Sequence, residues 1–490
     1  MNRIEVLEIK RRESILPELP GKISYIPKRK PRDGLLSRNN VLGLITVLIE
    51  KLDQEPHLLE AFVLAQVAGL PTLLVGPHGS GKTTMVKTLA SAFYIKGRPL
   101  KFKHITVKEI HTEYNVFARP DFGALAQGKE KWIPKLLDAE YAFIDEIFRN
   151  HRIMAALNEV LEEKQFEGLP LKWKFFVAAT NPPNAYYKTV DILNMADLDR
   201  FSVIVEVDDI GFGFADKMIE GFKPELDLKI DVSNLDEIRE EIASTKVSPE
   251  ASALAKMMVA AFSVCSYEPV EGKGLRRVTI YNKFGVINDL KCYRCVFQQH
   301  SICPKYALAP KRALRSLIHL ARARAWSLGR EVKEEDIVWA FRYTIPGRTA
   351  VISQELKEVV PTYKVLHDKM LEDFREWFED MRRYFIEGFR MENDPLLPIL
   401  REFVMEREVL EGYRVCIEGY TAEDLKRLAK WFVVNKGITA KRAAQIVEKL
   451  EKGISVIEGG LNLIPTNQSL AVEKFRDRRE AEALCEFLRK

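Results

Sequence analysis

The chain is poor in cysteine and has no long uncharged apolar run. Six cysteines in 490 residues are too few for a secreted scaffold held by disulfides, so the thiols are predicted to stay reduced or to bind a metal. A membrane span requires about 18 uncharged apolar residues in succession, and the opening residues, MNRIEVLEIKRRE, lack the apolar core of a secretory signal. We therefore expect a cytoplasmic protein without a membrane span.

Neither sign of charge dominates the sequence. Lys and Arg total 75, Asp and Glu total 70, and the net charge is +5. This balance does not by itself require nucleic acid or a membrane surface as partner. Residues 1–40 hold ten basic and five acidic residues, an excess equal to the net charge of the whole chain. They are predicted to be a basic N-terminal leader, which either stays solvated or acts as a basic arm.

Internal repeats and low-complexity linkers are also absent from the sequence. Its hydrophobic content of 47% and charged content of 30% are typical of globular proteins. Because one hydrophobic core stops growing near about 250–300 residues, a chain of this length is expected to form about three domains.

Apolar runs and helical stretches alternate in the first half of the chain. Residues 71–76, 141–145 and 174–180 read as buried strands, and residues 58–69 and 151–163 read as helices. Strands that alternate with helices predict an α/β fold with a mostly parallel, doubly wound sheet. Ligands of such sheets bind at the carboxyl ends of the strands.

A glycine-rich motif follows the first predicted strand. Its residues match G-x-x-x-x-G-K-[ST] and read Gly76-Pro77-His78-Gly79-Ser80-Gly81-Lys82-Thr83. In such a P-loop the backbone N–H groups surround phosphates, the lysine reaches the terminal phosphates and the hydroxyl binds Mg²⁺. Thr84 continues into a predicted helix, whose N-terminus favours anions. The alternative is a structural glycine-rich turn.

Polar residues end the other two predicted strands. Asp145 and Glu146 follow one strand, and Asn181 follows the next. The first acid is predicted to hold Mg²⁺, the second to polarise the attacking water, and the amide to orient that water. The alternatives are two solvated carboxylates and an Asn that starts a turn before Pro182.

Several segments together resemble one family. They are LLEAFVLAQVAGLPTLLVGPHGSGKT, IDEIFRNHRIMAALNEVLEEKQFEG, FFVAATNPP and ADLDRF. These segments are similar to the MoxR group of AAA+ ATPases, and DEIF followed by a long helix is closest to the RavA subgroup. The resemblance covers residues 55–205 well and 247–345 more loosely.

The resemblance implies roles for individual residues. Lys82 and Thr83 would form Walker A, Asp145 and Glu146 Walker B, and Asn181 sensor 1. Arg200 resembles an arginine finger that enters a neighbouring subunit's ATP site, where a guanidinium can stabilise charge on the γ-phosphoryl group; the alternative is a surface salt bridge with Asp197 or Asp199. Arg312 is the favoured sensor 2 residue, with Lys311 as the alternative.

The resemblance also implies an organisation and a set of partners. Residues 41–210 would form the α/β ATPase domain, 211–350 a helical lid, and 351–490 a helical C-terminal region. The expected activity is Mg²⁺-dependent ATP hydrolysis by a homo-oligomeric ring, with a hexamer favoured, that remodels a protein partner. A partner with a von Willebrand A domain is suspected. A motor on nucleic acid is the less favoured alternative, and an ATP-gated scaffold without steady turnover is another.

Two insertions are expected to project from the ATPase domain, where such rings engage substrates. They span residues 113–132 and 164–173. Tyr114, Phe117 and Trp132 would either touch a partner or belong to the local core.

Four cysteines fall within the predicted lid, in residues 265–306. They are Cys265, Cys292, Cys295 and Cys303. Thiolates two residues apart can converge on one metal, so these four residues suit Zn²⁺ or a [4Fe–4S] cluster. A zinc site with His300 in place of Cys265 and a set of unligated thiols are the alternatives. Cys416 and Cys485 read as ordinary core residues.

Overall fold

The chain divides into two compact units. In this computed structural model the described residues are 23–24, 26–52, 54–182, 195–207, 219, 221–223, 225–263, 267–270, 274–277, 302, 305–351, 353, 356 and 362–392. The unit formed by residues 17–263 and 305–372, called the main unit below, contains the P-loop. The predicted 41–210 domain and most of the predicted 211–350 lid fall in this unit.

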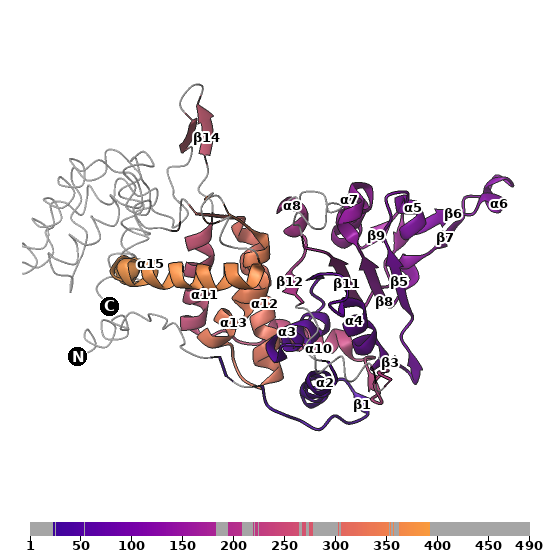
Figure 1. The fold of residues 1–490 in the computed structure, drawn as a ribbon, viewed down its shortest axis with the longest axis horizontal. Helices are drawn as coiled ribbons and strands as arrows, with labels where there is room; N and C mark the ends of the chain where they lie inside the picture. Colours follow the sequence, from indigo (N-terminus) through magenta and orange to yellow (C-terminus); the bar gives the residue numbers. More distant parts are fainter. Residues whose placement is uncertain are drawn as a thin grey trace, which may run out of the picture. The chain divides into compact units, whose positions relative to one another are not determined.

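A five-stranded parallel sheet forms the centre of the main unit (Figure 1). In the strand order β12-β2-β11-β8-β5, the strands are β12 (Val203–Glu206), β2 (Thr72–Val75), β11 (Phe175–Thr180), β8 (Tyr141–Asp145) and β5 (Phe102–Thr106). All residues of β2 and β11 are buried, as expected for a parallel sheet covered on both faces. The predicted strands and the α/β class are confirmed, and β5 and β12 extend the sheet.

Helices pack against this sheet. Helix α3 (Pro56–Val67) contacts β12, β2 and β11, and α4 (Lys82–Ser91) contacts β8. Helix α7 (His151–Glu163) has the bounds that the sequence predicts. Its buried residues repeat at the three- and four-residue spacing of one helical face: Ile153, Met154, Leu157 and Val160. The preceding Asn150 caps the helix by accepting a hydrogen bond from the Arg152 N–H.

A smaller sheet lies beside helix α2 (Arg38–Lys51). Its order is β1-β13-β3-β4, with β1 (Gly34–Leu35), β13 (Ile230–Asp231), β3 (Phe93–Ile95) and β4 (Arg98–Pro99). Strands of two or three residues leave little periodicity to detect in the sequence.

Three helices form a bundle at one side of the main unit (Figure 1). They are α11 (Pro249–Phe262), α12 (Pro310–Ser327) and α13 (Glu334–Thr344), and α10 (Leu235–Ser244) contacts both α12 and α3. The short helix η5 (Pro346–Arg348) follows α13, and β16 (Tyr306–Leu308) pairs with β17 (Thr349–Val351). We call this group the helical bundle.

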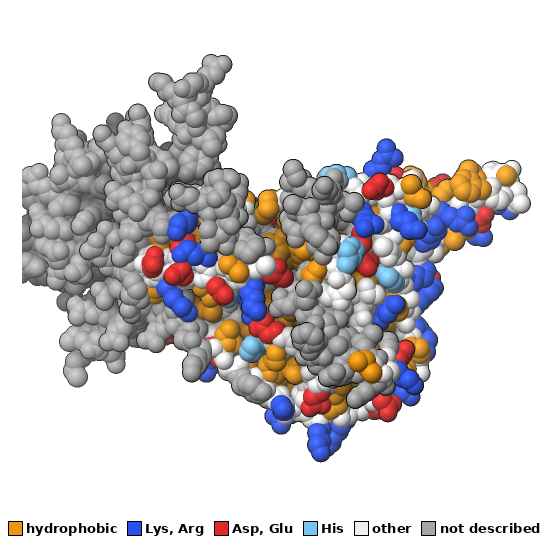
Figure 2. Space-filling view, in the orientation of Figure 1, with side chains coloured by type: hydrophobic (Ala, Val, Ile, Leu, Met, Phe, Trp, Pro, Cys, Tyr) orange, Lys and Arg blue, Asp and Glu red, His pale blue; other side chains and the backbone are white. Residues whose placement is uncertain are grey.

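A narrow arm extends from the sheet (Figure 1). It consists of α5 (Glu113–Val116), β6 (Ala118–Pro120), α6 (Phe122–Leu125) and β7 (Trp132–Pro134), with β6 and β7 antiparallel. Figure 2 shows hydrophobic side chains near its end and blue Lys and Arg side chains along it. The arm corresponds to the first predicted insertion.

The aromatic side chains predicted for the insertions lie at the base of the arm. Phe117 is fully buried, and Tyr114 stacks on Trp132 with ring centroids 5.9 Å apart. In the second insertion, β9 (Gln165–Phe166) and β10 (Leu169–Pro170) form a hairpin whose Phe166 is buried. Gln165, Glu167, Gly168 and Pro170 of this hairpin are exposed. The local-core alternative therefore holds for Phe117, whereas the arm's end exposes Phe122 and Leu125.

The second unit is described only in part. A hairpin of β14 (Tyr267–Val270) and β15 (Gly274–Arg277) belongs to it, and α15 (Tyr363–Glu392) continues into it from residue 373. Cys265, Cys292, Cys295, Cys303, His300, Cys416 and Cys485 lie outside the described residues, as do most of the predicted leader and most of the C-terminal region. Within the described ranges, no helix combines the length and apolar character needed to cross a membrane.

Candidate functional site

The P-loop connects the carboxyl end of β2 to the first turn of α4. A Cβ on Gly76 would lie 2.5 Å from the Val207 carbonyl oxygen and 2.8 Å from Ser80 Oγ, so only glycine fits there. Gly79 and Gly81 have φ angles of +83° and +81°, which side chains disfavour. The sequence thus bends into a tight cradle that ends on a helix N-terminus, a geometry suited to phosphate.

Lys82 is folded back onto the loop that precedes it. Its Nζ donates hydrogen bonds to the carbonyl oxygens of Gly76, at 2.6 Å, and Pro77, at 2.8 Å. The side chain is nearly buried, at 8% exposure. A buried ammonium held by carbonyl oxygens is a cation available to phosphate oxygens at the mouth of the same loop.

Asp145 lies beside Thr83 of the P-loop helix, although these two residues are 62 positions apart in sequence. Its Oδ2 accepts a hydrogen bond from Thr83 Oγ1 at 3.4 Å, and its Oδ1 accepts one from the Glu146 N–H at 2.9 Å. A hydroxyl and a carboxylate at this separation suit Mg²⁺, which takes few protein ligands and keeps waters and substrate oxygens. His104 Nε2 is 4.0 Å from Asp145 Oδ2, and burial lowers the pKa of His104.

Glu146 adopts a backbone conformation that is uncommon for a residue with a side chain. Its φ is +57° and its ψ is +41°, in the left-handed region. Its carboxylate is paired with Arg149 one turn later. Backbone strain of this kind is often found at functional sites. At Glu146 the left-handed conformation turns the chain sharply after β8.

Asn181 lies at the carboxyl end of β11 and faces the P-loop. Its Nδ2 is 3.1 Å from His78 Nε2, and the side chain is nearly buried, at 4% exposure. The carbonyl of the preceding Thr180 accepts a hydrogen bond from the Gly76 N–H at 3.2 Å. The predicted phosphate loop, acidic pair and asparagine therefore converge at adjacent strand ends.

Arg200 and Arg312 meet at one acidic residue. Both guanidinium groups form ion pairs with Glu162 of α7, and for Arg312 the distance is 2.8 Å. Arg312 is also 3.3 Å from Asp199 Oδ2. Lys311 forms no ion pair with another described residue, and the choice between Arg312 and Lys311 as sensor 2 stays a prediction.

Arg200 does not form the salt bridge that was its alternative. Asp197 instead accepts a hydrogen bond from Asn158 at 3.2 Å, and Asp199 faces Arg312 and Arg348. Burial lowers the pKa of Arg200, and the nearby Arg312 lowers it further. Glu162 forms ion pairs with both guanidinium groups and so partly offsets the repulsion between them.

Sequence reasoning missed Arg149, Glu162 and Arg348. Glu162 and Arg149 lie on segments quoted for the family resemblance, but their partners depend on packing. Arg348 lies 147 residues from the Phe201 carbonyl that it contacts. Only the fold brings these groups together.

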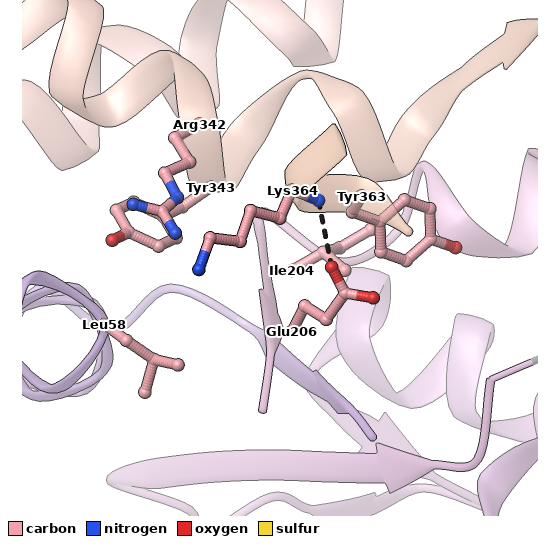
Figure 3. Close-up of a pocket in the computed structure, with 7 residues that line it drawn as sticks. All are labelled: Leu58, Ile204, Glu206, Arg342, Tyr343, Tyr363 and Lys364. Carbon is pink, nitrogen blue, oxygen red and sulfur yellow. Dashed lines mark hydrogen bonds between the residues drawn. The ribbon is translucent and has the colours of Figure 1, made fainter. Parts of the chain in front are cut away.

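A pocket opens between the sheet edge and the helical bundle (Figure 3). It is lined by Leu58, Ile204, Glu206, Arg342, Tyr343, Tyr363 and Lys364. The Glu206 carboxylate accepts a hydrogen bond from the Lys364 N–H at 2.9 Å. No P-loop residue lines this pocket, so we do not assign the catalytic chemistry to it.

The predicted cysteine site is not tested by the structure. Its cysteines lie outside the described residues. Across the part of the chain that is described, no group of three or more His, Cys, Asp or Glu side chains has the arrangement of a metal site.

Comparisons with known proteins agree with this geometry. Residues 40–244 match the family model of the MoxR domain in the MoxR-vWA-beta-propeller ternary systems. A crystal structure of a predicted ATPase from Cytophaga hutchinsonii is similar in fold, with a TM-score of 0.51 and 19% identity over 69% of this chain and 94% of that one.

A curated viral protein is also similar over part of the sequence. Structural protein ORF618 of Acidianus two-tailed virus is 33% identical over 167 residues, which cover 31% of this chain. The chain spans only 25% of the length of that protein. Together with the parallel sheet and its P-loop, the family match shows that residues 40–244 form a domain similar to the MoxR domain of that model.

Proposed function

We propose that the chain hydrolyses ATP with Mg²⁺ at the carboxyl ends of β2, β8 and β11. The observation that carries this proposal is the 3.4 Å hydrogen bond between Thr83 Oγ1 and Asp145 Oδ2. It joins the phosphate loop to the acidic strand end, as a Mg²⁺-nucleotide site requires.

Each residue at these strand ends has a distinct task in the proposal. Lys82 and the P-loop N–H groups bind phosphate oxygens, and Thr83 and Asp145 hold Mg²⁺, which neutralises phosphate charge when bound. Glu146 accepts a proton from the attacking water, and this requires its carboxylate to leave Arg149. Asn181, held by His78, orients that water.

The proposed active unit is a homo-oligomeric ring, with a hexamer favoured. Arg200 would leave Glu162 and reach the nucleotide of a neighbouring subunit, where its guanidinium stabilises charge on the transferring phosphoryl group. Arg312, on the bundle that we assign as the lid, would contact the nucleotide of its own subunit. Two arginines held by one exposed carboxylate support this proposal, because such ion pairs are weak and readily exchanged.

The proposed task of the ring is to remodel a protein partner. The arm supports this assignment because its end helix α6 buries none of its residues, while Phe122 and Leu125 are 65% and 53% exposed. An acidic polypeptide with apolar side chains would cover this end and complement the flanking Arg119, Lys129 and Lys131. A von Willebrand A domain is the proposed partner class, since the matching family model is described from MoxR-vWA systems.

Two substitutions separate nucleotide binding from hydrolysis. Lys82→Ala should lose nucleotide affinity because it removes the cation of the loop. Glu146→Gln should keep affinity but hydrolyse ATP at least ~100-fold more slowly if general-base catalysis is lost. Titration with a fluorescent nucleotide and steady-state phosphate release measure the two effects. Near-normal turnover by Glu146→Gln would contradict the proposed role of Glu146.

A further inference from the structure

Arg348 is a buried cation that contacts Asp199 and Phe201, the two residues that flank Arg200. Its Nη2 donates a hydrogen bond to the carbonyl oxygen of Phe201, and its Nη1 is 3.5 Å from Asp199 Oδ1. The side chain is 1% exposed. A guanidinium can hold two acceptors at a fixed separation because its donors form a rigid fork.

The η5 turn, which contains Arg348, packs closely against β12 of the sheet. A Cβ on Gly347 would lie 2.8 to 2.9 Å from three side-chain atoms of Ile204 on β12. Arg348 Nη1 is also 3.4 Å from Ser316 Oγ on α12. The η5 turn is thus fixed to the helical bundle on one side and to the chain around Arg200 on the other.

The Arg348 guanidinium is buried but still charged. Burial lowers the pKa of Arg348 to about 10, against the opposing attraction of Asp199, so the group stays charged at neutral pH. Burying a charge is unfavourable unless its partners are held in good geometry. The partners here are the two neighbours of the proposed arginine finger.

We infer that Arg348 is the positioning residue through which the helical bundle sets the orientation of Arg200. This inference rests on the proposed role of Arg200 at the neighbouring subunit's site. When the bundle shifts, η5 moves the chain at Asp199 and Phe201, and Arg200 between them turns. The position of the bundle thereby controls the finger that this subunit presents to the next.

Substitution of Arg348 should cause a loss of ATP turnover that a neighbouring subunit can restore. Arg348→Met should lower kcat by about 10- to 100-fold through misplacement of Arg200, while the nucleotide Kd of its own intact P-loop changes less than about threefold. Co-assembly with Lys82→Ala subunits should restore part of the turnover, because those subunits present an intact finger to an intact P-loop. Arg200→Ala, co-assembled in the same way, sets the reference level of restoration.

Matched variants distinguish positioning from general damage. Arg342→Met removes another ion pair between the bundle and the rest of the unit, the one with Glu55 at 2.7 Å, and should leave turnover nearly unchanged. Gly347→Ala keeps the guanidinium but pushes η5 from Ile204, and should show the same repairable defect as Arg348→Met. If Arg348→Met does not fold, Gly347→Ala and Arg348→Lys carry the test.

The outcomes separate this inference from the proposed function. Restoration for Arg200→Ala but not for the Arg348 and Gly347 variants would overturn the positioning role, as would unchanged kcat in those variants. Absence of restoration for Arg200→Ala itself, with an active unsubstituted protein, would instead reject the finger role on which the inference rests.

Discussion

Glu162 is a single carboxylate that holds two arginines assigned to nucleotide chemistry. Its side chain is 52% exposed, and it pairs with Arg200 and Arg312 from separate segments of the chain. For either arginine to contact phosphate, its bond with Glu162 must be exchanged for one with a phosphate oxygen. Exposed ion pairs contribute only about 0–1 kcal/mol, so Glu162 delays this exchange without preventing it.

Removing this competitor should strengthen nucleotide binding. Glu162→Gln is expected to lower the Kd for ATP by up to about fivefold, the factor that corresponds to about 1 kcal/mol. The neighbouring Glu163→Gln is the matched control, since Glu163 contacts Gln165 and neither arginine. Isothermal titration in the Glu146→Gln background measures the affinity without hydrolysis. A Glu162→Gln variant that binds ATP more weakly would indicate that Glu162 orients the arginines productively.

The catalytic residues differ in how far the sequence predicts them. Lys82 and Thr83 are predicted because a P-loop needs a fixed local spacing. Asn181 is predicted as a polar strand end and, through the family resemblance, as sensor 1, but its contact with His78 spans 103 positions and carries no local signal. Glu162 carries no local signal, because an acidic residue on an exposed helical face usually has only solvent as a partner.

At the scale of elements, the strands that are buried on both faces of the sheet are the ones that the sequence predicts most directly. Strands β2, β8 and β11 are continuous apolar runs, so they stand out from their surroundings. The arm has no such run, and its order comes from local hydrogen bonds. Asp121 Oδ1 accepts from the Gly123 and Ala124 N–H groups, and the Asp121 N–H donates to the Lys131 carbonyl at 2.7 Å. A fixed end helix that buries none of its own residues is suited to contact another molecule.

The exposed end of the arm should contribute to partner engagement without affecting basal turnover. Phe122→Ser with Leu125→Ser should weaken stimulation of the ATPase by an acidic unfolded polypeptide such as α-casein by about tenfold or more, because burial of each side chain contributes about 1.5–3 kcal/mol. Ile219→Ser is the control, since Ile219 is 84% exposed outside the arm. Equal stimulation of the arm variant and the control would remove the arm from the proposed partner surface.

At the scale of the whole molecule, a buried ion network attaches the helical bundle to the sheet domain. Arg324 on α12 is fully buried and lies 3.2 Å from Glu60 on α3 and 2.9 Å from Asp336 on α13. It also donates to the carbonyl of Ser24, 300 positions earlier. Removing one member of such a network leaves an unpaired buried charge, so this network is expected to stabilise the attachment of α12 and α13 to α3.

Elemental analysis tests whether the cysteines of residues 265–303, which lie between α11 and α12 in the sequence, bind a metal. Cys292 and Cys295 can approach one ion from a tight turn, and Cys303 with Cys265 or His300 can complete four ligands. The protein purified without chelator or metal-affinity tag should then carry about one zinc per chain, or iron and a brown colour if a cluster forms. Because bound metal stabilises only the folded chain, Cys292→Ser with Cys295→Ser should lower Tm by about 5 °C or more. Cys416→Ser, the control, should lower Tm less. Zinc and iron both well below one equivalent by elemental analysis would show that these thiols hold no metal.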